Sequence, residues 1–375
     1  MEAVTQSAPP RRVLVLNSGS STLKWTVLDV SGETTLVEGT ETWAAKEEAA
    51  RAEQIRATLR QLPDFDAVGH RVVHGGERFR DTTRVDPDVR AALEALVDLD
   101  PLHMRPALAG IDAIAHSFPR IPQFVAFDTA FHASMGEAAS GYAVPFEWTE
   151  QFGVRRFGFH GLSVRHAVDR ATAMLGRVPL RLIVCHLGSG CSMTAVRDGK
   201  SIDTTMGFSP LEGLVMGSRS GSIDPGVMLH VMRRGMTVDE LSHALTEKSG
   251  LLGVSGISGD LREVLAAADS GNPRAALSYQ RFVLSAQRHV GAMMAVLGGL
   301  DALLFTGGIG ENSARLRRDV CGPLAFAGVS IDEAKTESPD VDVSIASSPV
   351  RVLVVRARED LVILRDVMRV FPGLP

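Results

Sequence analysis

The sequence has only three cysteines and no apolar run long enough to cross a membrane. Cys185, Cys191 and Cys321 contain no CxxC pair and leave at least one residue unpaired, so we expect reduced thiols rather than a disulfide framework. Met1–Pro10 is polar and ends in proline, without the apolar core of a signal peptide. We therefore expect residues 1–10 to be a disordered tail and the protein to be cytoplasmic, with no membrane partner.

A surplus of positive charge is also missing. Lysine and arginine total 39 against 44 acidic residues, which gives a formal net charge of -5. This balance gives no basic surface for nucleic acid and no reason to expect binding to a membrane surface. Any site for an anion must therefore be local.

The common nucleotide and hydrolase fingerprints are absent as well. Gly199-Lys200-Ser201 ends like a Walker A motif, but Thr194 stands where that loop needs its first glycine. No GxGxxG follows a strand in a βαβ setting, and no HExxH, Cys/His metal cluster or GxSxG elbow is present. Zinc hydrolases and serine hydrolases are therefore not leading interpretations.

What is present is the composition of an ordinary globular protein. Hydrophobic residues make up 45% and charged residues 22% of 375 residues. Because this length exceeds what one core usually supports, we expect two domains.

A strand, a turn of small residues and a second strand begin the ordered sequence at Val13–Asp29. The turn offers glycine backbone N–H groups, hydroxyls, an amide and a lysine, which suit phosphate oxygens or a phosphate-bound metal. An ordinary hairpin with a solvated lysine is the alternative. Leu182–Val196 superimposes on Val13–Val27 without a gap, Gly19 on Gly188, and Leu303–Asn312 supplies a third glycine-rich turn. The repetition predicts two similar halves that hold a nucleotide between them.

Polar residues recur where predicted strands and helices meet loops. Arg71 lies near the end of a strand that enters a Gly-Gly turn, although a surface arginine paired with Glu77 would look the same. Asp128 lies at the carboxyl end of a strand, where α/β sheets tend to place ligands, and His160 precedes a helix that runs to about Leu175. Elsewhere we expect helices over 42–62, 89–97 and 108–116, with a loop over 102–106 between the last two. Residues 202–225 read as an active-site loop that carries Arg219.

This inventory suits phosphoryl transfer, which needs positioning and positive charge more than covalent chemistry. A carboxylic acid with a pKa near 4 is already ionised at neutral pH, so as the acceptor it would need no general base. Four apolar residues beside the arginines are candidates for lining a small acyl pocket, although they could equally be packing residues. They are Val73, Leu102, Phe159 and Pro210.

Six motifs, taken together and in this order, resemble the acetate kinase (acetokinase) family, which includes acetate and propionate kinases. They are Asn17–Lys24, Gly69–Gly76, Phe127–His132, Phe157–Gly161, Met206–Gly213 and Gly307–Asn312. The resemblance implies an α/β fold with a duplicated ribonuclease-H-like core, as in actin, hexokinase and Hsp70, and a cleft between two domains. We expect the N-terminal actin-like domain to comprise 11–129 with 360–375, and the C-terminal one 130–359.

The resemblance also implies roles for individual residues. Arg71 and Arg219 would clamp the carboxylate and the moving phosphoryl group, His160 would donate a hydrogen bond to that group, and Asp128 would orient an arginine or the metal. Asn17 and Glu359 would hold Mg²⁺, with Mn²⁺ as an alternative. The residues implied to bind ATP or ADP are Ser20, Thr22, Lys24, His186, Gly188, Ser189, Gly190, Asp260, Leu261, Arg262, Gly307, Gly308, Ile309, Gly310 and Asn312.

Some positions depart from the family's usual pattern. Ser189 stands where an amide is common, and Val164 stands where a histidine is common; the other departures are Met104, Leu162 and Ser222. The resemblance predicts reversible, ATP-dependent phosphorylation of acetate by direct in-line transfer, in a homodimer. A kinase that prefers propionate or another short acid is the nearest alternative, and a catalytically impaired nucleotide-binding regulatory protein is the alternative from another class.

Overall fold

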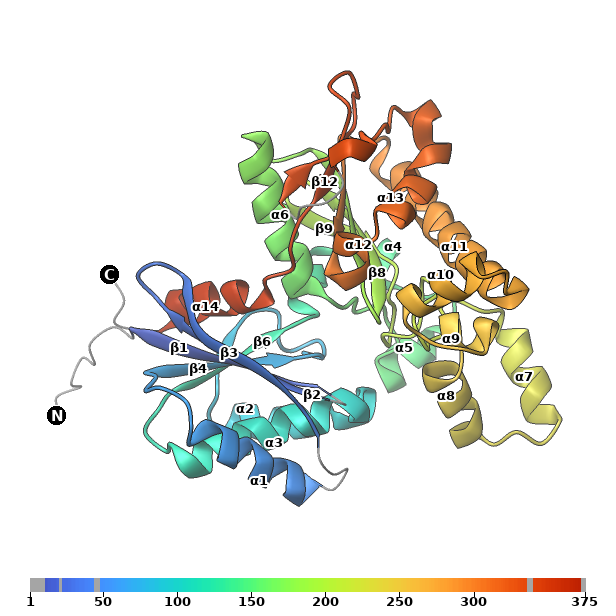
Figure 1. Cartoon of the computed structure of the whole chain (residues 1–375). Helices are drawn as coiled ribbons and strands as arrows, with labels where there is room; N and C mark the ends of the chain where they lie inside the picture. Colours follow the sequence, from blue (N-terminus) through green and yellow to red (C-terminus); the bar gives the residue numbers. More distant parts are fainter. Residues whose placement is uncertain (1–10, 20–21, 44–47, 336–339, 372–375) are drawn as a thin grey trace. The chain divides into compact units, whose positions relative to one another are not determined.

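The computed structural model describes residues 11–19, 22–43, 48–335 and 340–371 (Figure 1). These residues form two compact units: unit 1 holds those up to Phe131 and those from Arg358 onward, and unit 2 is His132–Ala357. The tail expected over residues 1–10 lies outside the described residues. No described helix is long and apolar enough to cross a membrane. The three cysteines are free and buried, in agreement with the expectation of reduced thiols.

Unit 1 is a mixed six-stranded sheet in the order β3-β2-β1-β4-β6-β5. The first three strands are antiparallel, β1, β4 and β6 are parallel, and β5 is an antiparallel edge. The strands are β1 (Arg12–Ser18), β2 (Thr22–Asp29), β3 (Thr34–Thr42), β4 (Ala67–Val72), β5 (Thr83–Arg84) and β6 (Gln123–Phe127).

Helices cover both faces of this sheet. Apolar side chains of α1 (Glu48–Leu59) and α3 (Pro101–Ser117) pack on one face, against Leu14, Leu16 and Val68. On the other face α14 (Glu359–Val370) lies so close to β4 that an added Cβ on Gly69 would sit 2.4 Å from Ile363. The short helices of unit 1 are α2 (Pro87–Glu94) and the 3₁₀ turn η1 (Val97–Leu99).

Unit 2 repeats this arrangement with the strand order β11-β12-β10-β7-β8-β9. Its strands are β7 (Arg181–Leu187), β8 (Cys191–Arg197), β9 (Lys200–Thr204), β10 (Ala302–Thr306), β11 (Val341–Asp342) and β12 (Arg351–Val354). Its α-helices are α4 (Glu137–Ser140), α5 (Phe146–Phe152), α6 (Gly161–Leu175), α7 (Pro225–Arg233), α8 (Val238–Glu247), α9 (Gly250–Ser255), α10 (Leu261–Asp269), α11 (Pro273–Leu297), α12 (Gly307–Asn312) and α13 (Ala314–Cys321). The 3₁₀ turns η3 (Gly322–Ala327) and η4 (Glu333–Lys335) precede β11, and η2 (Ala130–Ser134) contains the step from unit 1 to unit 2.

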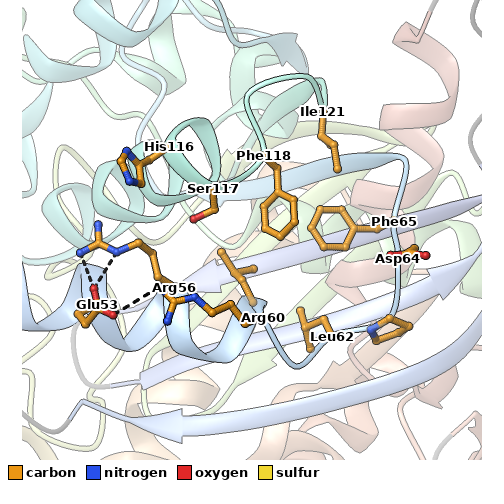
Figure 2. A pocket seen from close by; sticks show the side chains of 12 residues that line it. Glu53, Arg56, Arg60, Leu62, Asp64, Phe65, His116, Ser117, Phe118 and Ile121 are labelled. Carbon is orange, nitrogen blue, oxygen red and sulfur yellow. Dashed lines mark hydrogen bonds and ion pairs between the residues drawn. The ribbon is translucent and has the colours of Figure 1, made fainter.

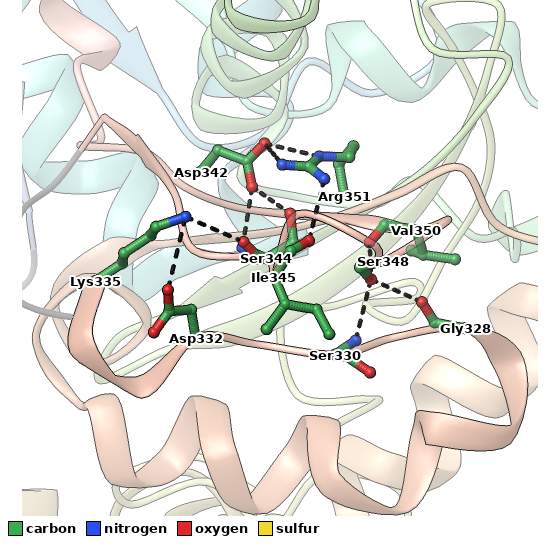
Figure 3. Close-up of polar contacts among 10 residues, drawn as sticks. All are labelled: Gly328, Ser330, Asp332, Lys335, Asp342, Ser344, Ile345, Ser348, Val350 and Arg351. Carbon is green, nitrogen blue, oxygen red and sulfur yellow. Dashed lines mark hydrogen bonds and ion pairs between the residues drawn. The ribbon is translucent and has the colours of Figure 1, made fainter.

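The edge strand β11 has only two residues, and hydrogen bonds of side chains help to hold it in the sheet. Arg351 of β12 donates to Asp342 Oδ2 from Nε at 2.8 Å, and the Ser344 amide donates to the other oxygen of Asp342 at 3.0 Å (Figure 3). Ser348 donates to the Gly328 carbonyl at 2.8 Å and ties the segment before β12 to the end of η3. These hydrogen bonds hold β11 against β12 at the edge of the second sheet.

The common strand order confirms the α/β class and the duplication, but the gapless superposition of the two hairpins is wrong by one residue. Leu187 pairs with Cys191, whereas its counterpart Ser18 pairs with Leu23, so the second turn is shorter. In the second turn the Gly188 amide accordingly donates to the carbonyl of Gly190, two residues later in the chain. In the first turn the Gly19 amide donates to the carbonyl of Thr22, three residues later. The second strand of each hairpin has a register shift against the strand that follows it, at Val27/Leu28 in β2 and at Ala195/Val196 in β8. The residue numbers of these two shifts differ by 168, whereas those of Ser18 and Leu187, at the ends of the first strands, differ by 169.

Two other expectations about local structure are wrong, and a third is right only in part. Residues 102–106 are not a loop, because Asp100 caps the His103 amide and Pro101 takes the first position of α3, which then continues through Pro106. The helix expected over 42–62 is found over Glu48–Leu59, but Thr42 is the last residue of β3. The glycine-rich turn 307–312 is a short helix, α12.

Candidate functional site

The polar centre of unit 1 is an arginine held by two carboxylates. Arg71 at the end of β4 donates from Nε to Asp128 Oδ1 at 2.8 Å and from Nη2 to Oδ2 at 2.6 Å. Its Nη1 lies 3.2 Å from Glu359 Oε2 at the start of α14. Asp128 directly follows β6, the parallel neighbour of β4, so the sheet itself brings the two residues together. Arg71 is thus fixed by partners from two further elements.

Burial and charge act in opposite directions on this arginine. Burial acts to lower the pKa of Arg71, but the carboxylates of Asp128 and Glu359 outweigh it and hold that pKa above its ordinary value. The Asp128 side chain is 1% exposed, whereas the Arg71 side chain keeps 18%. A permanently charged guanidinium with a fixed orientation and a partly open edge can bind a carboxylate or phosphoryl oxygen.

The first hairpin lies in the same sheet. Asn17 and Lys24 are directly opposite each other on β1 and β2, Lys24 is exposed, and Thr22 begins β2. The Trp43 indole donates to the Gly19 carbonyl at 2.8 Å and fixes the near end of the turn. Ser20, another residue expected to bind the nucleotide, lies outside the described residues.

Asn17 and Glu359 both belong to unit 1, and their oxygen donors suit Mg²⁺. Among the described residues no group of three or more His, Cys, Asp or Glu side chains could enclose a metal ion.

Unit 2 gathers a second set of cationic and polar groups. The rings of His160 and His186 lie 4.3 Å apart, and His160 Nδ1 is 3.0 Å from Ser192 Oγ. An added Cβ on Gly190 would sit 3.4 Å from His160 Nε2 and 3.6 Å from Arg219 Nη1. Because Gly190 has no side chain, His160 and Arg219 can both approach the backbone of the hairpin turn.

His160 is positioned by its backbone as well. It has φ = 58°, which is uncommon outside glycine, and it directly precedes α6. The preceding carbonyl, Phe159 O, lies 2.9 Å from Nε2 of the buried His132, whose Nδ1 lies 2.9 Å from Ser201 Oγ. Burial lowers the pKa of His132 to about 4, so this imidazole is neutral and can donate to the carbonyl.

The Arg219 loop and α12 lie near the second hairpin turn. The Gly217 amide donates to the Ser189 carbonyl at 3.0 Å, and an added Cβ on Gly217 would lie 3.0 Å from the Gly259 carbonyl. An added Cβ on Gly188 would lie 4.0 Å from the amide nitrogen of Gly308 in α12. The turn therefore contacts the Arg219 loop and lies beside α12, and the Arg219 loop in turn contacts Gly259.

The residues expected around adenosine differ in exposure. Asp260 caps α10, because its side chain accepts a hydrogen bond from the Arg262 amide at 2.8 Å. The same carboxylate forms an ion pair with the exposed Arg262 side chain. Leu261 is 3% exposed and packs inside unit 2. In α12, Gly308 is exposed, Ile309 is half-buried, and the Asn312 side chain donates to the Gly308 carbonyl at 2.8 Å.

The four residues expected to line an acyl pocket fall in different units. Val73 is half-buried after β4 and Leu102 is 50% exposed on α3, both in unit 1. Phe159 is 1% exposed in unit 2, where the Pro210 carbonyl accepts from Arg219 Nη1 at 3.1 Å. Their role in acyl binding stays a prediction.

Sequence reasoning missed several residues that position this site. Arg156 donates to Glu212 at 2.7 Å and to the Met206 carbonyl at 3.2 Å, and Glu212 also accepts from the Tyr142 hydroxyl. These bonds hold the Met206–Gly213 loop in place. The charges of Arg156 and Glu212 were visible in the sequence, but their separation by 56 positions gave no local signal for the pair.

A hollow of about 900 Å³ lies elsewhere, in unit 1 between the end of α1 and the end of α3 (Figure 2). Phe65 and Phe118 line it edge to face, and Glu53 pairs with Arg56 at its rim at 2.7 Å. None of the expected site residues lines this hollow.

Comparison with known proteins gives one consistent result. The model described as the acetokinase family matches residues 52–365. The acetate kinase of Gloeobacter violaceus is 52% identical over 309 residues, which cover 81% of this chain and 76% of that protein.

Solved structures extend the similarity to nearly the whole chain. The acetate kinase of Porphyromonas gingivalis is 36% identical with a TM-score of 0.88, over 96% of this chain and 99% of that one. A propionate kinase from Francisella tularensis subsp. tularensis SCHU S4 is 34% identical with a TM-score of 0.87, over 95% and 98% of the two chains.

Proposed function

The chain belongs to the acetokinase family, and we propose that it transfers the terminal phosphoryl group of ATP to acetate, reversibly, to give ADP and acetyl phosphate. The observation that carries the proposal is the pairing of Arg71 with Asp128 and Glu359, together with the cluster of His160, His186 and Arg219. Each unit presents a fixed cationic group of the kind that phosphoryl transfer requires.

In this reaction the residues orient the substrates and stabilise the negative charge of the phosphoryl group. Acetate is ionised at neutral pH, so its oxygen attacks phosphorus without a base. Arg71, oriented by two bonds to Asp128, binds the carboxylate or an equatorial phosphoryl oxygen, and Arg219 binds the phosphoryl group from unit 2. With Nδ1 engaged by Ser192, His160 would donate from Nε2 to the oxygen on which charge grows. Transfer is in line, without a phosphoenzyme.

Asn17 and Glu359 are the residues that would hold Mg²⁺, with Mn²⁺ as the alternative. When bound, the cation would neutralise charge on the nucleotide phosphates. Glu359 would then serve both the cation and Arg71, whose Nη1 it already approaches at 3.2 Å. Thr22, Lys24, His186, Gly188, Ser189 and Gly190 would contact phosphates, and the 260–262 and α12 residues would contact adenosine.

An acyl hydroxamate assay with ATP, Mg²⁺ and acetate tests the proposal. We expect ATP-dependent acetyl hydroxamate from the purified chain and none when ATP is omitted. ATP binding without any acyl phosphate would instead favour the nucleotide-binding regulatory protein. The similarity to a propionate kinase makes propionate the second candidate substrate, because one methylene in an apolar pocket changes binding by only ~1–3 kcal/mol.

We also propose that the protein acts in the cytoplasm as a homodimer. Helices α7 and α8 contain no buried residue, although Val227, Leu229 and Val238 are more than half exposed. A second copy would cover this face. Light scattering that gives a monomer mass for the wild type would contradict the dimer, and a monomer only after Leu229→Glu would support this face.

A further inference from the structure

The chain returns from unit 2 to unit 1 at the peptide bond between Ala357 and Arg358, and both of these residues are held by hydrogen bonds. On the unit 2 side, the Ala357 amide donates to Glu311 Oε1 at 2.9 Å. On the unit 1 side, Arg358 donates from Nε to Asp360 Oδ1 at 2.9 Å and from Nη2 to Thr35 Oγ1 at 3.2 Å. The two anchored residues, Ala357 and Arg358, are adjacent in the sequence.

The carboxylate oxygen that holds Ala357 has a second partner. Glu311 Oε1 also accepts from the Gly307 amide, again at 2.9 Å. Gly307 begins α12 with φ = +80°, and an added Cβ there would lie 2.7 Å from the Leu187 carbonyl. One charged oxygen therefore joins the first residue of α12 to the last residue of unit 2.

The backbone of Glu311 is itself fixed. Arg317 is fully buried and donates from Nη1 to the carbonyls of Gly310 at 2.7 Å and Glu311 at 2.8 Å. Two residues before the crossing, the Val355 amide donates to the Phe305 carbonyl at 2.9 Å. The Glu311 carboxylate is thus held between two secured segments.

From these contacts we propose that Glu311 is a positioning residue that couples α12 to the chain crossing and so to Glu359, two residues beyond Ala357. The inference rests on the proposed function, in which a nucleotide contacts Gly307, Gly308 and Gly310. A nucleotide that orders α12 would then also order the crossing, which sets the first turn of α14 and the carboxylate beside Arg71. By linkage, ligands of Arg71 would strengthen nucleotide binding through the same bond.

Hydrogen exchange of the amides of 357–363 tests the coupling, with ADP added in EDTA so that no metal bridges the nucleotide to Glu359. In the wild type we expect ADP to slow this exchange roughly tenfold, the scale of one hydrogen bond to a carboxylate. In Glu311→Ala we expect ADP to bind, by calorimetry, without slowing it, and in Glu311→Gln, which keeps an acceptor oxygen, a partial response.

Glu240→Gln is the matched control. Glu240 is another unit 2 carboxylate that accepts a backbone amide, that of Thr237 at 2.8 Å, but it belongs to α8. We expect it to keep the full wild-type response. Unchanged exchange in a wild type that binds ADP, or a full response in both Glu311 variants, overturns the coupling alone. A wild type that binds ADP neither in EDTA nor with Mg²⁺ overturns the proposed function and the coupling with it. Where binding needs Mg²⁺, the same comparison of variants is made with Mg²⁺ present. If Glu311→Ala does not fold, Glu311→Gln decides, and a full response in it counts against the coupling.

Discussion

At the scale of single residues, Arg71 depends on a buried partner. Asp128 is 1% exposed and gives both oxygens to the guanidinium, so removing the arginine leaves a carboxylate inside unit 1 without its main counter-charge. Such losses are costly because a lone buried charge must be desolvated without compensation. The charge that would bind substrate therefore also stabilises the unit.

Arg71→Ala should lower kcat for acetyl phosphate formation by roughly 10³-fold or more, the scale of arginines that stabilise phosphoryl transfer. Steady-state kinetics with ATP and acetate measure it. Arg90→Ala is the control, because Arg90 also pairs with an aspartate through two bonds and with a glutamate, but on the exposed surface of α2. A loss below tenfold for Arg71→Ala, or equal losses for both, would contradict the assignment.

Two buried histidines make stability depend on pH. Burial lowers the pKa values of His70 and His132 from 6.5 to about 4. The unfolded chain therefore binds more protons between those values, so this contribution to stability is complete above pH 6.5 and is lost as the pH falls toward 4. The loss is up to roughly 3 kcal/mol per histidine. Urea unfolding at pH 7.5 and pH 5 checks it, and equal free energies of unfolding at both would count against it.

The sequence predicts polar residues at strand ends better than it predicts their partners. Arg71 and Asp128 were singled out because each lies at a strand end, and parallel β4 and β6 place them together. Glu311 was visible only as part of a glycine-rich motif, since its contact with Ala357 joins positions 46 apart. Long-range pairs of this kind depend on the packed sheet and leave no periodicity in the sequence.

At the scale of elements, the glycines at the start of α12 have unequal roles. Gly307 has a positive φ and lies against the Leu187 backbone, whereas an added Cβ on Gly308 would meet no atom within 4 Å. Gly307→Ala should lower the free energy of unfolding by roughly 1–3 kcal/mol or more, and Gly308→Ala by much less. Thermal unfolding of both variants compares them, and equal melting temperatures would refute the distinction.

The hairpin comparison shows what repetition in a sequence can and cannot establish. Matching apolar residues identified both strand pairs, since strand alternation survives where identity does not. The sequence does not reveal that the second turn is one residue shorter than the first, because Gly, Ser and Cys fit either turn length. The sequence predicts a loop over 102–106, but the cap at Asp100 starts α3 at Pro101, and the helix continues through Pro106.

At the scale of the whole molecule, two units are joined by two chain crossings, after Phe131 and after Ala357. In the proposed function, residues of both units bind the substrates, which would draw the units together and exclude water. We therefore expect ADP with acetate to decrease the radius of gyration in small-angle scattering, relative to either ligand alone. Identical profiles with and without both ligands would count against closure.

The most direct test of the account is kcat/KM for formate, acetate, propionate and butyrate with ATP and Mg²⁺. We expect ATP-dependent acyl phosphate formation with the highest kcat/KM for acetate, and propionate next, because the two acids differ by one methylene. Equal or better use of propionate would contradict acetate as the substrate, and no acyl phosphate from any of the four acids would contradict the kinase itself.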